Sequence, residues 1–353
     1  MTLPLLDAHP QIARDCPAAG FLIAPTAIEP LRGVDGVFIK RDDLTASDYG
    51  GNKIRKLDFL LAHAKARGSK TVVAFGYAGS NFVAATAWHA RKLGLRTIGG
   101  LLPQVAADYI VDNLSVSIAA RAELFLRGSE PALIAEAAAR SVLATLRDRA
   151  WPPWIPPGGS SAIGALGFVN AALEIAAQID AGAMPAPAQI VIAFSSMGSV
   201  AGLAAGLALA GIDARITAVQ VVDAQRASKP KLLKLTDALV HLLRAHSIRI
   251  SDAQTIVDRV DIRGDFFGGE YARADSTVKS AMARFARDSG TRVDSAYTGK
   301  ALAALYSDLD ANRLRRPALY WHTLSKSTLP PGVARATSNQ APGELRHYWE
   351  AVR

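Results

Sequence analysis

The sequence predicts an α/β fold in which parallel twisted sheets are flanked by helices and the chain forms two domains. Continuous apolar runs, such as residues 71–75 and 189–194, are typical of parallel strands buried on both faces. Each run leads into a loop of small residues and then into a helical stretch, and this alternation indicates right-handed parallel crossovers. At 353 residues the chain is long enough for two domains of ordinary size.

The expected elements follow this alternation along the chain. A strand at 37–39 comes first, and a helix begins at residue 53 after the turn at Gly50 and Gly51. The next strands are expected at 71–75, 97–102 and 123–126, with helices at 82–93 and 108–120. After a proline-rich crossing at 151–159, we expect strands at 189–194, 216–222 and 318–322, and helices at 160–177, 200–210, 277–289 and after residue 300.

These elements suggest a division of the chain. We place a small inserted α/β domain at 54–162 and a large domain at 1–53 and 163–353. Residues 325–353, rich in Pro, Ser and polar residues, are expected to form a surface tail.

Composition narrows the class of protein. The formal charge is +9, but the basic residues are dispersed and lack interleaved aromatic residues, so we expect no nucleic-acid binding. The only cysteine, Cys16, can form no internal disulfide, which fits a reducing compartment. His63 and His89 have no metal-ligand partners at suitable spacing, so no metal site is expected. With no signal peptide and no apolar run of membrane-spanning length, we expect a soluble cytoplasmic protein.

Lys53 stands out because two glycines precede it and an amphipathic helix follows it. The glycines let the backbone approach a ligand closely. One interpretation of Lys53 is a solvated residue in a basic run with Arg55 and Lys56. The other is a nucleophilic amine whose pKa is lowered by burial and neighbouring cations, so that it can form a Schiff base.

Two loops that follow predicted strands carry further candidates. Residues 195–199 join a buried strand to an Ala- and Gly-rich helix, and backbone N–H groups at a helix start, joined by hydroxyl groups, can hold a phosphate. The alternative is a plain short loop. Ser80 and Asn81 open the helix after the strand at 71–75, where the residues alone indicate an N-cap pair.

The run GGNKIRKLDFLL strongly resembles the cofactor-lysine segment of a family of pyridoxal-phosphate (PLP) enzymes. That family contains D-cysteine desulfhydrase and 1-aminocyclopropane-1-carboxylate (ACC) deaminase, and its fold is PLP fold type II, the tryptophan synthase β-like fold. Further motifs agree in the family's order between about Pro25 and Thr323. They are Ser80-Asn81, Gly158-Gly159-Ser160-Ser161, the run SSMGSVAGL from Ser195, Gly268-Gly269-Glu270-Tyr271 and Tyr297-Thr298-Gly299-Lys300.

The resemblance implies a cofactor site. Lys53 would hold PLP as a Schiff base, and Asn81 would bind the hydroxyl group of the cofactor ring. The large domain would carry the phosphate contacts, made mostly through the backbone. These contacts would come from Ser196, Met197, Gly198 and Ser199. Thr298 would contact the pyridine nitrogen.

The resemblance also implies catalytic roles. Lys53, once released, would take the α-proton of an amino acid. Ser80 would lie on the substrate side as a proton-transfer or nucleophilic group, Tyr297 would place its phenol near the reacting carbon, and Tyr271 would be a second tyrosine near the substrate. Ring-opening deaminases carry Glu at the position of Thr298, whereas the desulfhydrase-like branch carries Thr. A hydroxyl tolerates a neutral ring, which suits α,β-elimination.

The expected function is therefore a PLP-dependent lyase or deaminase that acts on a small amino acid by α-proton abstraction and β-elimination, similar to D-cysteine desulfhydrase. Residues that depart from the family pattern leave alternatives open; they are Gly79, Phe82, Met197, Leu324 and Ser325. The alternatives are ring opening as in ACC deaminase, β-replacement, racemisation, a specialised biosynthetic enzyme for an unusual, more apolar amino acid, and an inactive homologue that binds PLP or an amino acid. Because relatives are usually dimers, we expect a homodimer.

Overall fold

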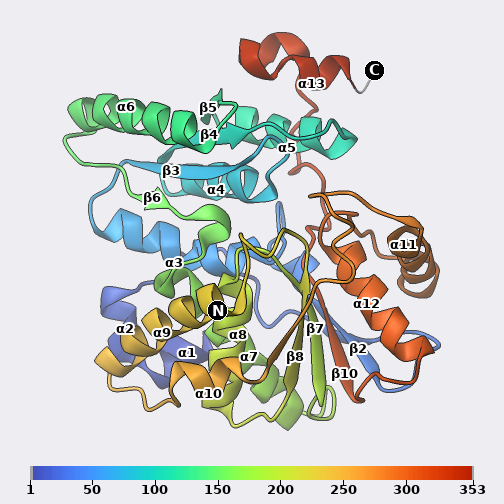
Figure 1. Cartoon of the computed structure of the whole chain (residues 1–353). Helices are drawn as coiled ribbons and strands as arrows, with labels where there is room; N and C mark the ends of the chain where they lie inside the picture. Colours follow the sequence, from blue (N-terminus) through green and yellow to red (C-terminus); the bar gives the residue numbers. More distant parts are fainter. Residues whose placement is uncertain (1–2, 352–353) are drawn as a thin grey trace.

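Two parallel sheets organise the computed structural model, which describes residues 3–351 (Figure 1). The larger sheet has the strand order β1-β2-β10-β7-β8-β9. Its strands are β1 (Ile28–Pro30), β2 (Val37–Arg41), β7 (Gln189–Phe194), β8 (Arg215–Gln220), β9 (Val260–Arg263) and β10 (Ala318–His322). Only β1 runs antiparallel to its neighbour in this sheet. The apolar run of β7 lies at the centre of the sheet, buried on both faces as expected.

The smaller sheet is parallel throughout, with the order β5-β4-β3-β6. Its strands are β3 (Thr71–Tyr77), β4 (Arg96–Leu102), β5 (Glu123–Leu126) and β6 (Trp154–Ile155). The helices that connect them are α4 (Asn81–Lys92), α5 (Asp108–Ala119) and α6 (Glu130–Asp148). The α/β class is confirmed, but β6 and α6 were not predicted. Within the proline-rich crossing, two residues of β6 pair with Val73 and Ala74, so the crossing also closes the sheet.

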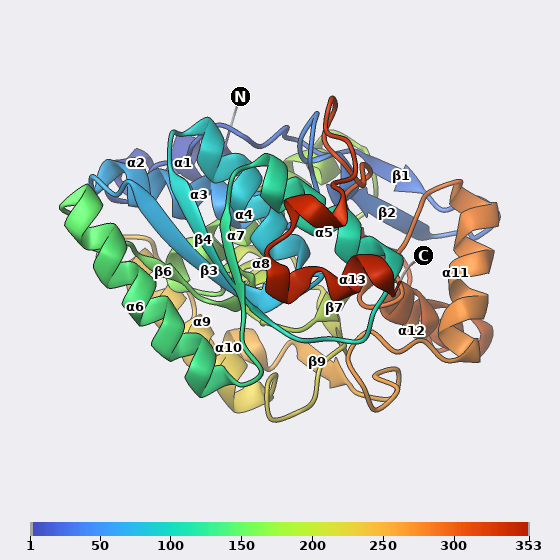
Figure 2. The ribbon, with the colours of Figure 1, turned by 90° about the horizontal axis from the view of Figure 1, so that it is seen from above.

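Helices cover the larger sheet on both faces, as Figures 1 and 2 show. They are α1 (Pro4–Ala8), α2 (Pro10–Asp15), α7 (Ala162–Asp180), α8 (Gly198–Ala210), α9 (Lys229–Ala245), α10 (Ala253–Val257), α11 (Ser276–Ser289) and α12 (Thr298–Asp310). Helix α3 (Lys53–Ala66) packs against α7 and α4, and most of its apolar face joins the cluster of the smaller sheet. Helices α7 and α8 can pack closely because Gly202 has no side chain. A Cβ at this position would overlap the backbone carbonyl of Ala165. This pair forms the centre of the main hydrophobic core.

One helix differs from the expectation about membrane-spanning length. By length and composition α7 could cross a membrane, so the expectation that the chain has no apolar run of this length is wrong. Of its most apolar window, 61% is buried inside the protein. A buried core helix meets the same criteria, and α7 packs in this way against α8 and α3.

The prediction of a surface tail at 325–353 is wrong for its last part. Leu345, Tyr348 and Trp349 are buried in the hydrophobic cluster of the smaller sheet. The short helix α13 (His347–Glu350) lies against α5, as Figure 2 shows from above. The indole N–H of Trp349 donates to the carbonyl of Ala336 at 2.6 Å. The spacing of the apolar residues Leu345, Tyr348 and Trp349 was the sequence signal for this buried segment. The domain limits at 1–53, 54–162 and 163–353 stay a prediction.

Candidate functional site

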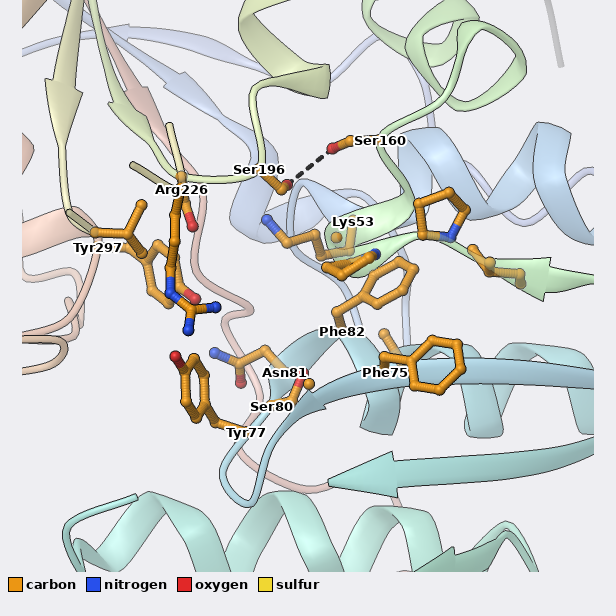
Figure 3. A pocket seen from close by; sticks show the side chains of 18 of the residues that line it. Lys53, Phe75, Tyr77, Ser80, Asn81, Phe82, Ser160, Ser196, Arg226 and Tyr297 are labelled. Atoms are coloured by element: carbon orange, nitrogen blue, oxygen red, sulfur yellow. Dashed lines mark hydrogen bonds between the residues drawn. The ribbon is translucent and has the colours of Figure 1, made fainter. Parts of the chain in front are cut away.

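A cavity of about 970 Å³ lies between the two sheets. Its walls come from the carboxyl ends of β3, β4, β7 and β10, where ligands bind in open α/β sheets. Figure 3 shows Lys53, Ser80 and Asn81 between two groups of aromatic side chains. Tyr77 and Tyr297 lie on one side, and Phe75 and Phe82 lie on the other.

Lys53 enters this cavity because the turn before it is fixed to the end of β10. The backbone N–H of Asn52 donates to the carbonyl of Thr323 at 3.1 Å. Gly51 has φ +92°, and a Cβ there would lie 3.1 Å from the backbone nitrogen of Ser325. Only glycine takes this conformation at such a close approach without strain. Helix α3 therefore begins at Lys53, with the side chain directed at the cavity.

The amine of Lys53 is suited to nucleophilic chemistry. Within residues 3–351 it makes no hydrogen bond or ion pair, and its Nζ lies 5.7 Å from the ring centre of Tyr297. Burial lowers the pKa of Lys53 from 10.5 to about 8, and the negative charge of Asp294 partly opposes this shift. The interpretation of a solvated basic run is wrong, because Arg55 and Lys56 are both fully buried.

A buried ion network holds α3 in place below the cavity. Arg55 pairs with Asp42 at 2.7 Å and with Glu174 of α7 at 2.8 Å. Lys40 of β2 pairs with the same Glu174 at 2.5 Å. The indole N–H of Trp321 in β10 donates to Asp42 at 2.7 Å. The network therefore ties the first turn of α3 to β2, β10 and α7.

Asn81 is oriented by hydrogen bonds that the sequence did not reveal. Asn113 of α5 donates through Nδ2 to Asn81 Oδ1 at 2.8 Å and to the carbonyl of Gly79 at 2.9 Å. The hydroxyl of Tyr49 donates to Asn113 Oδ1 at 2.9 Å. The bond from Asn113 thus fixes the orientation of the Asn81 amide, so that its NH₂ group can donate to a ligand.

Ser80 is the N-cap of α4, as the residues alone indicated. Its hydroxyl accepts from the backbone N–H of Val83 at 3.2 Å, and it also lines the cavity. Capping leaves the hydroxyl proton free to point toward a substrate.

The loop between β7 and α8 forms a cradle with positive character. Met197 adopts the left-handed conformation with φ +68°, which places the start of α8 at Gly198. Ser160 Oγ donates to Ser196 Oγ at 2.9 Å and accepts from the N–H of Gly198 at 3.1 Å. Figure 3 marks the contact between the two serines. The N-terminus of a helix favours an anion at this place.

Lys56 adds a cation beside this cradle. Its Nζ donates to the carbonyl of Gly158 at 2.9 Å and pairs with no carboxylate in residues 3–351. A side chain on Gly158 would overlap Ser196 Oγ, so this contact lies next to the loop. Burial and the charge of Lys53 lower the pKa of Lys56 well below its ordinary value. Two lysines without carboxylate partners make the region suitable for an anion.

Three tyrosines form the opposite wall. The hydroxyl groups of Tyr271 and Tyr297 are 2.7 Å apart. The ring of Tyr77 stacks on Tyr271 with 4.9 Å between ring centres. Burial raises the pKa of Tyr297 and of Tyr271 above the ordinary value, so both phenols keep their protons at neutral pH and can donate them.

Thr298 does not line the cavity, and neither does Gly198. The buried hydroxyl of Thr298 donates to Asp294 Oδ2 at 2.7 Å and accepts from the backbone N–H of Asp294 at 2.7 Å. Asp294 itself reaches the cavity and was missed from the sequence. The other predicted residues are brought together: Lys53, Ser80, Asn81, Ser196, Met197, Tyr271 and Tyr297 line the cavity, and Ser199 lines a small recess behind Lys53.

Comparisons with known proteins agree on one family. Residues 21–323 match the family described as pyridoxal-phosphate dependent enzyme. D-cysteine desulfhydrase of Salmonella typhimurium is 33% identical over 321 residues, which cover 87% of this chain and 93% of that protein. The D-cysteine desulfhydrase of Salmonella schwarzengrund is 34% identical over 314 residues, 85% of this chain and 91% of that one. The crystal structure of an ACC deaminase homologue has TM-score 0.75 and 28% identity, covering 93% of this chain and 97% of its own.

Proposed function

Because this chain belongs to the family of pyridoxal-phosphate-dependent enzymes, with the fold of type II, we propose that it eliminates the β-substituent of a small amino acid. It is a PLP-dependent enzyme of the lyase and deaminase class. The observation that carries the proposal is Lys53, a partly buried amine that lines the cavity, has a lowered pKa and makes no hydrogen bond or ion pair within the described residues 3–351.

The residues present fit PLP. An anionic phosphate suits the start of α8 together with the unpaired Lys56, and the free NH₂ group of Asn81 suits a ring oxygen. PLP supplies an aldehyde for the lysine amine and an electron sink for a carbanion. We propose Lys53 as its attachment, Asn81 as a ring contact, and a set of phosphate contacts consisting of Ser196, Met197, Ser199 and, in addition to the predicted residues, Lys56. Thr298 and Gly198 do not line the cavity, so we propose that they act behind these contacts, Thr298 by holding Asp294 and Gly198 by holding Ser160.

The chain's own groups would move the protons. With a pKa of about 8, the Lys53 amine can accept the α-proton near neutral pH. The hydroxyl of Ser80 and the phenols of Tyr297 and Tyr271 line the same cavity and can donate to the leaving group or to the substrate. Thr298, unlike the glutamate of ring-opening deaminases, brings no negative charge of its own, which supports elimination rather than ring opening.

A substrate panel tests this function. The PLP-loaded protein is incubated with both enantiomers of cysteine and serine and with ACC, while keto acid and ammonia are measured. We expect keto acid from a cysteine enantiomer and none from ACC. Binding of these amino acids without any keto acid would instead identify an inactive homologue. We also propose that the enzyme is a homodimer, and light scattering of the same sample tests this.

The pH dependence of cofactor attachment tests the lowered pKa of Lys53. Only the neutral amine attacks an aldehyde, and burial lowers its pKa from 10.5 to about 8. The rate at which apoprotein takes up PLP should therefore rise about tenfold per pH unit below pH 8 and level off above it. Stopped-flow absorbance measures this rate. A rate that keeps rising to pH 10 would show that the amine is not desolvated.

Replacing Asn113 with alanine tests the orientation of Asn81. The change removes the donor to Asn81 Oδ1 and leaves the carbonyl of Gly79 without a partner. A lost buried hydrogen bond costs about 1–3 kcal/mol, so we expect the Kd for PLP to rise by about 5- to 150-fold. Absorbance titration measures this Kd. As a control, Ser117→Ala removes a buried hydroxyl on the next turn of α5 and should leave the Kd unchanged.

A further inference from the structure

The cavity extends from Lys53 into a side arm that the chemistry proposed above does not use. Six apolar side chains line this arm, and they come from β3, β4, β6 and the first turns of α4 and α6. They are Phe75, Phe82, Leu102, Leu133, Ile134 and Trp154. Figure 3 shows Phe82 and Phe75 on the side of the cavity away from Tyr77 and Tyr297.

The six side chains of the arm offer a substrate no polar contact, and the carboxylate of Glu130 at the start of α6 is paired with Arg226. Trp154 packs edge-on against Phe75 at 5.3 Å between ring centres. Its indole N–H already donates to Ser141 Oγ at 2.9 Å, so it is not available to a ligand. Ile134 faces the cavity with 53% of its surface exposed, which is a large apolar area to leave in water. An apolar group in the arm would remove this surface from water.

Residues near the reacting groups also exclude polar contacts to a substrate side chain. A Cβ on Gly79 would lie 2.6 Å from the ring of Tyr109 and 2.8 Å from Ile110, so packing excludes any side chain at position 79. Phe82 presents a ring where a polar side chain would be needed to bind a small polar substituent. The wall next to Ser80 is therefore apolar.

Two cations apart from Lys53 line the cavity, Arg226 and Lys231, and the amine of Lys231 donates to the backbone carbonyl of Gln225. Arg226 reaches into the cavity, as Figure 3 shows, but it pairs with Glu130 at 3.0 Å and with Asp223 at 3.3 Å. Both carboxylates also line the cavity. The positive charge of Arg226 is thus compensated, and an anionic substituent would lie beside two carboxylates.

Cysteine leaves the arm unfilled. The cavity volume of about 970 Å³ includes the space that PLP would occupy beside Lys53, Asn81 and Ser196, and the apolar arm lies on another side of the cavity. Beyond its thiol, cysteine has no group that could fill the arm.

We infer that the substrate is an amino acid whose β-carbon carries a bulky apolar group, such as an S-aryl or S-alkyl cysteine. This inference rests on the proposed elimination reaction. The Cα–H bond and the Cβ–S bond break, and the sulfur leaves as a thiol with one proton. Water then converts the remaining aminoacrylate to pyruvate and ammonia, so the reaction is redox-neutral. The apolar arm would hold the thiol's organic group.

Competition between S-benzylcysteine and cysteine of the same handedness tests this inference. For each substrate kcat/KM is measured from pyruvate release, and Kd is measured by calorimetry, with both enantiomers of each. Because the benzyl group is buried in the arm, kcat/KM for S-benzylcysteine should be about 10- to 100-fold higher than for cysteine. If there is no turnover, Kd should be lower by the same factor. Equal or weaker binding and turnover of S-benzylcysteine would overturn the inference and leave elimination standing. If S-benzylcysteine binds more tightly than cysteine but no substrate yields pyruvate, the apolar arm does bind the benzyl group and the proposed elimination is wrong.

Two variants on α6 test whether the benzyl group binds in the apolar arm. Ile134→Asp places a charge in the arm at an already exposed position, so folding should be preserved. We expect the preference for S-benzylcysteine over cysteine to fall at least about 10-fold. Leu146→Asp changes an even more exposed apolar residue of the same helix, outside the cavity, and should keep the preference. An unchanged preference in Ile134→Asp would show that the benzyl group binds elsewhere.

Discussion

Replacing Lys53 with alanine is expected to lower kcat/KM for elimination by about 10³-fold or more. The substitution removes both the amine that attaches PLP and the base that takes the α-proton, and a positioned base alone contributes about 10²–10⁴-fold. The other lysines near the cavity are bonded elsewhere: the amine of Lys56 donates to the carbonyl of Gly158, and that of Lys231 donates to the carbonyl of Gln225. Keto-acid release by the PLP-loaded variant measures the effect.

Lys56→Met is the matched control for this variant. Lys56 lies on the same helix and is fully buried, and we propose that it contacts only the phosphate. The methionine variant should bind PLP more weakly and retain most of its kcat when PLP is in excess. If the Lys56 variant lost activity as completely as the Lys53 variant, our assignment of the two lysines would be wrong.

Replacing Glu174 with alanine is expected to destabilise the protein by about 3–5 kcal/mol, because it leaves Arg55 and Lys40 buried without this carboxylate. Urea unfolding at pH 7 measures the loss. Glu123→Ala is the control, since Glu123 is about half exposed and pairs with Arg140 at the surface. Such a pair contributes at most about 1 kcal/mol. Equal losses in the two variants would show that the buried network does not hold α3.

The same network predicts a sensitivity to acid. Burial raises the pKa of Glu174, but the charges of Arg55 and Lys40 outweigh it and hold that pKa at about 2, below the ordinary 4.5. A carboxyl group with a lowered pKa stabilises the fold fully above pH 4.5 and loses this contribution as the pH falls toward 2. The unfolding free energy should therefore decrease between pH 5 and pH 2, and decrease less in Glu174→Gln.

The fold could be predicted where local pattern and tertiary structure agree. The apolar runs that became β3 and β7 are buried on both faces, so their composition alone identified them. The last segment was misjudged because its polar composition hid three apolar residues that pack on the smaller sheet; these are Leu345, Tyr348 and Trp349. The two-residue strand β6 was missed because its pairing with β3 is a property of the tertiary fold.

The site was predictable as a set of motifs but not as a network. Lys53, Ser80, Asn81, Tyr271 and Tyr297 were identified and line one cavity. The partners that orient them come from elsewhere in the fold. Asn113 and Asp294 have no motif that marks them, since their importance arises only from contacts with Asn81 and Thr298. For the same reason the sequence could not distinguish a buried Lys56 from a solvated one.

Attachment of PLP to Lys53 is the central claim, and borohydride reduction followed by peptide mass spectrometry tests it most directly. Reduction makes the link between a lysine amine and the PLP aldehyde permanent, and fragmentation distinguishes Lys53 from Lys56 on the same helix. The account predicts the PLP mass on Lys53 alone. A modified Lys56 with an unmodified Lys53, or no modified peptide at all, would contradict it.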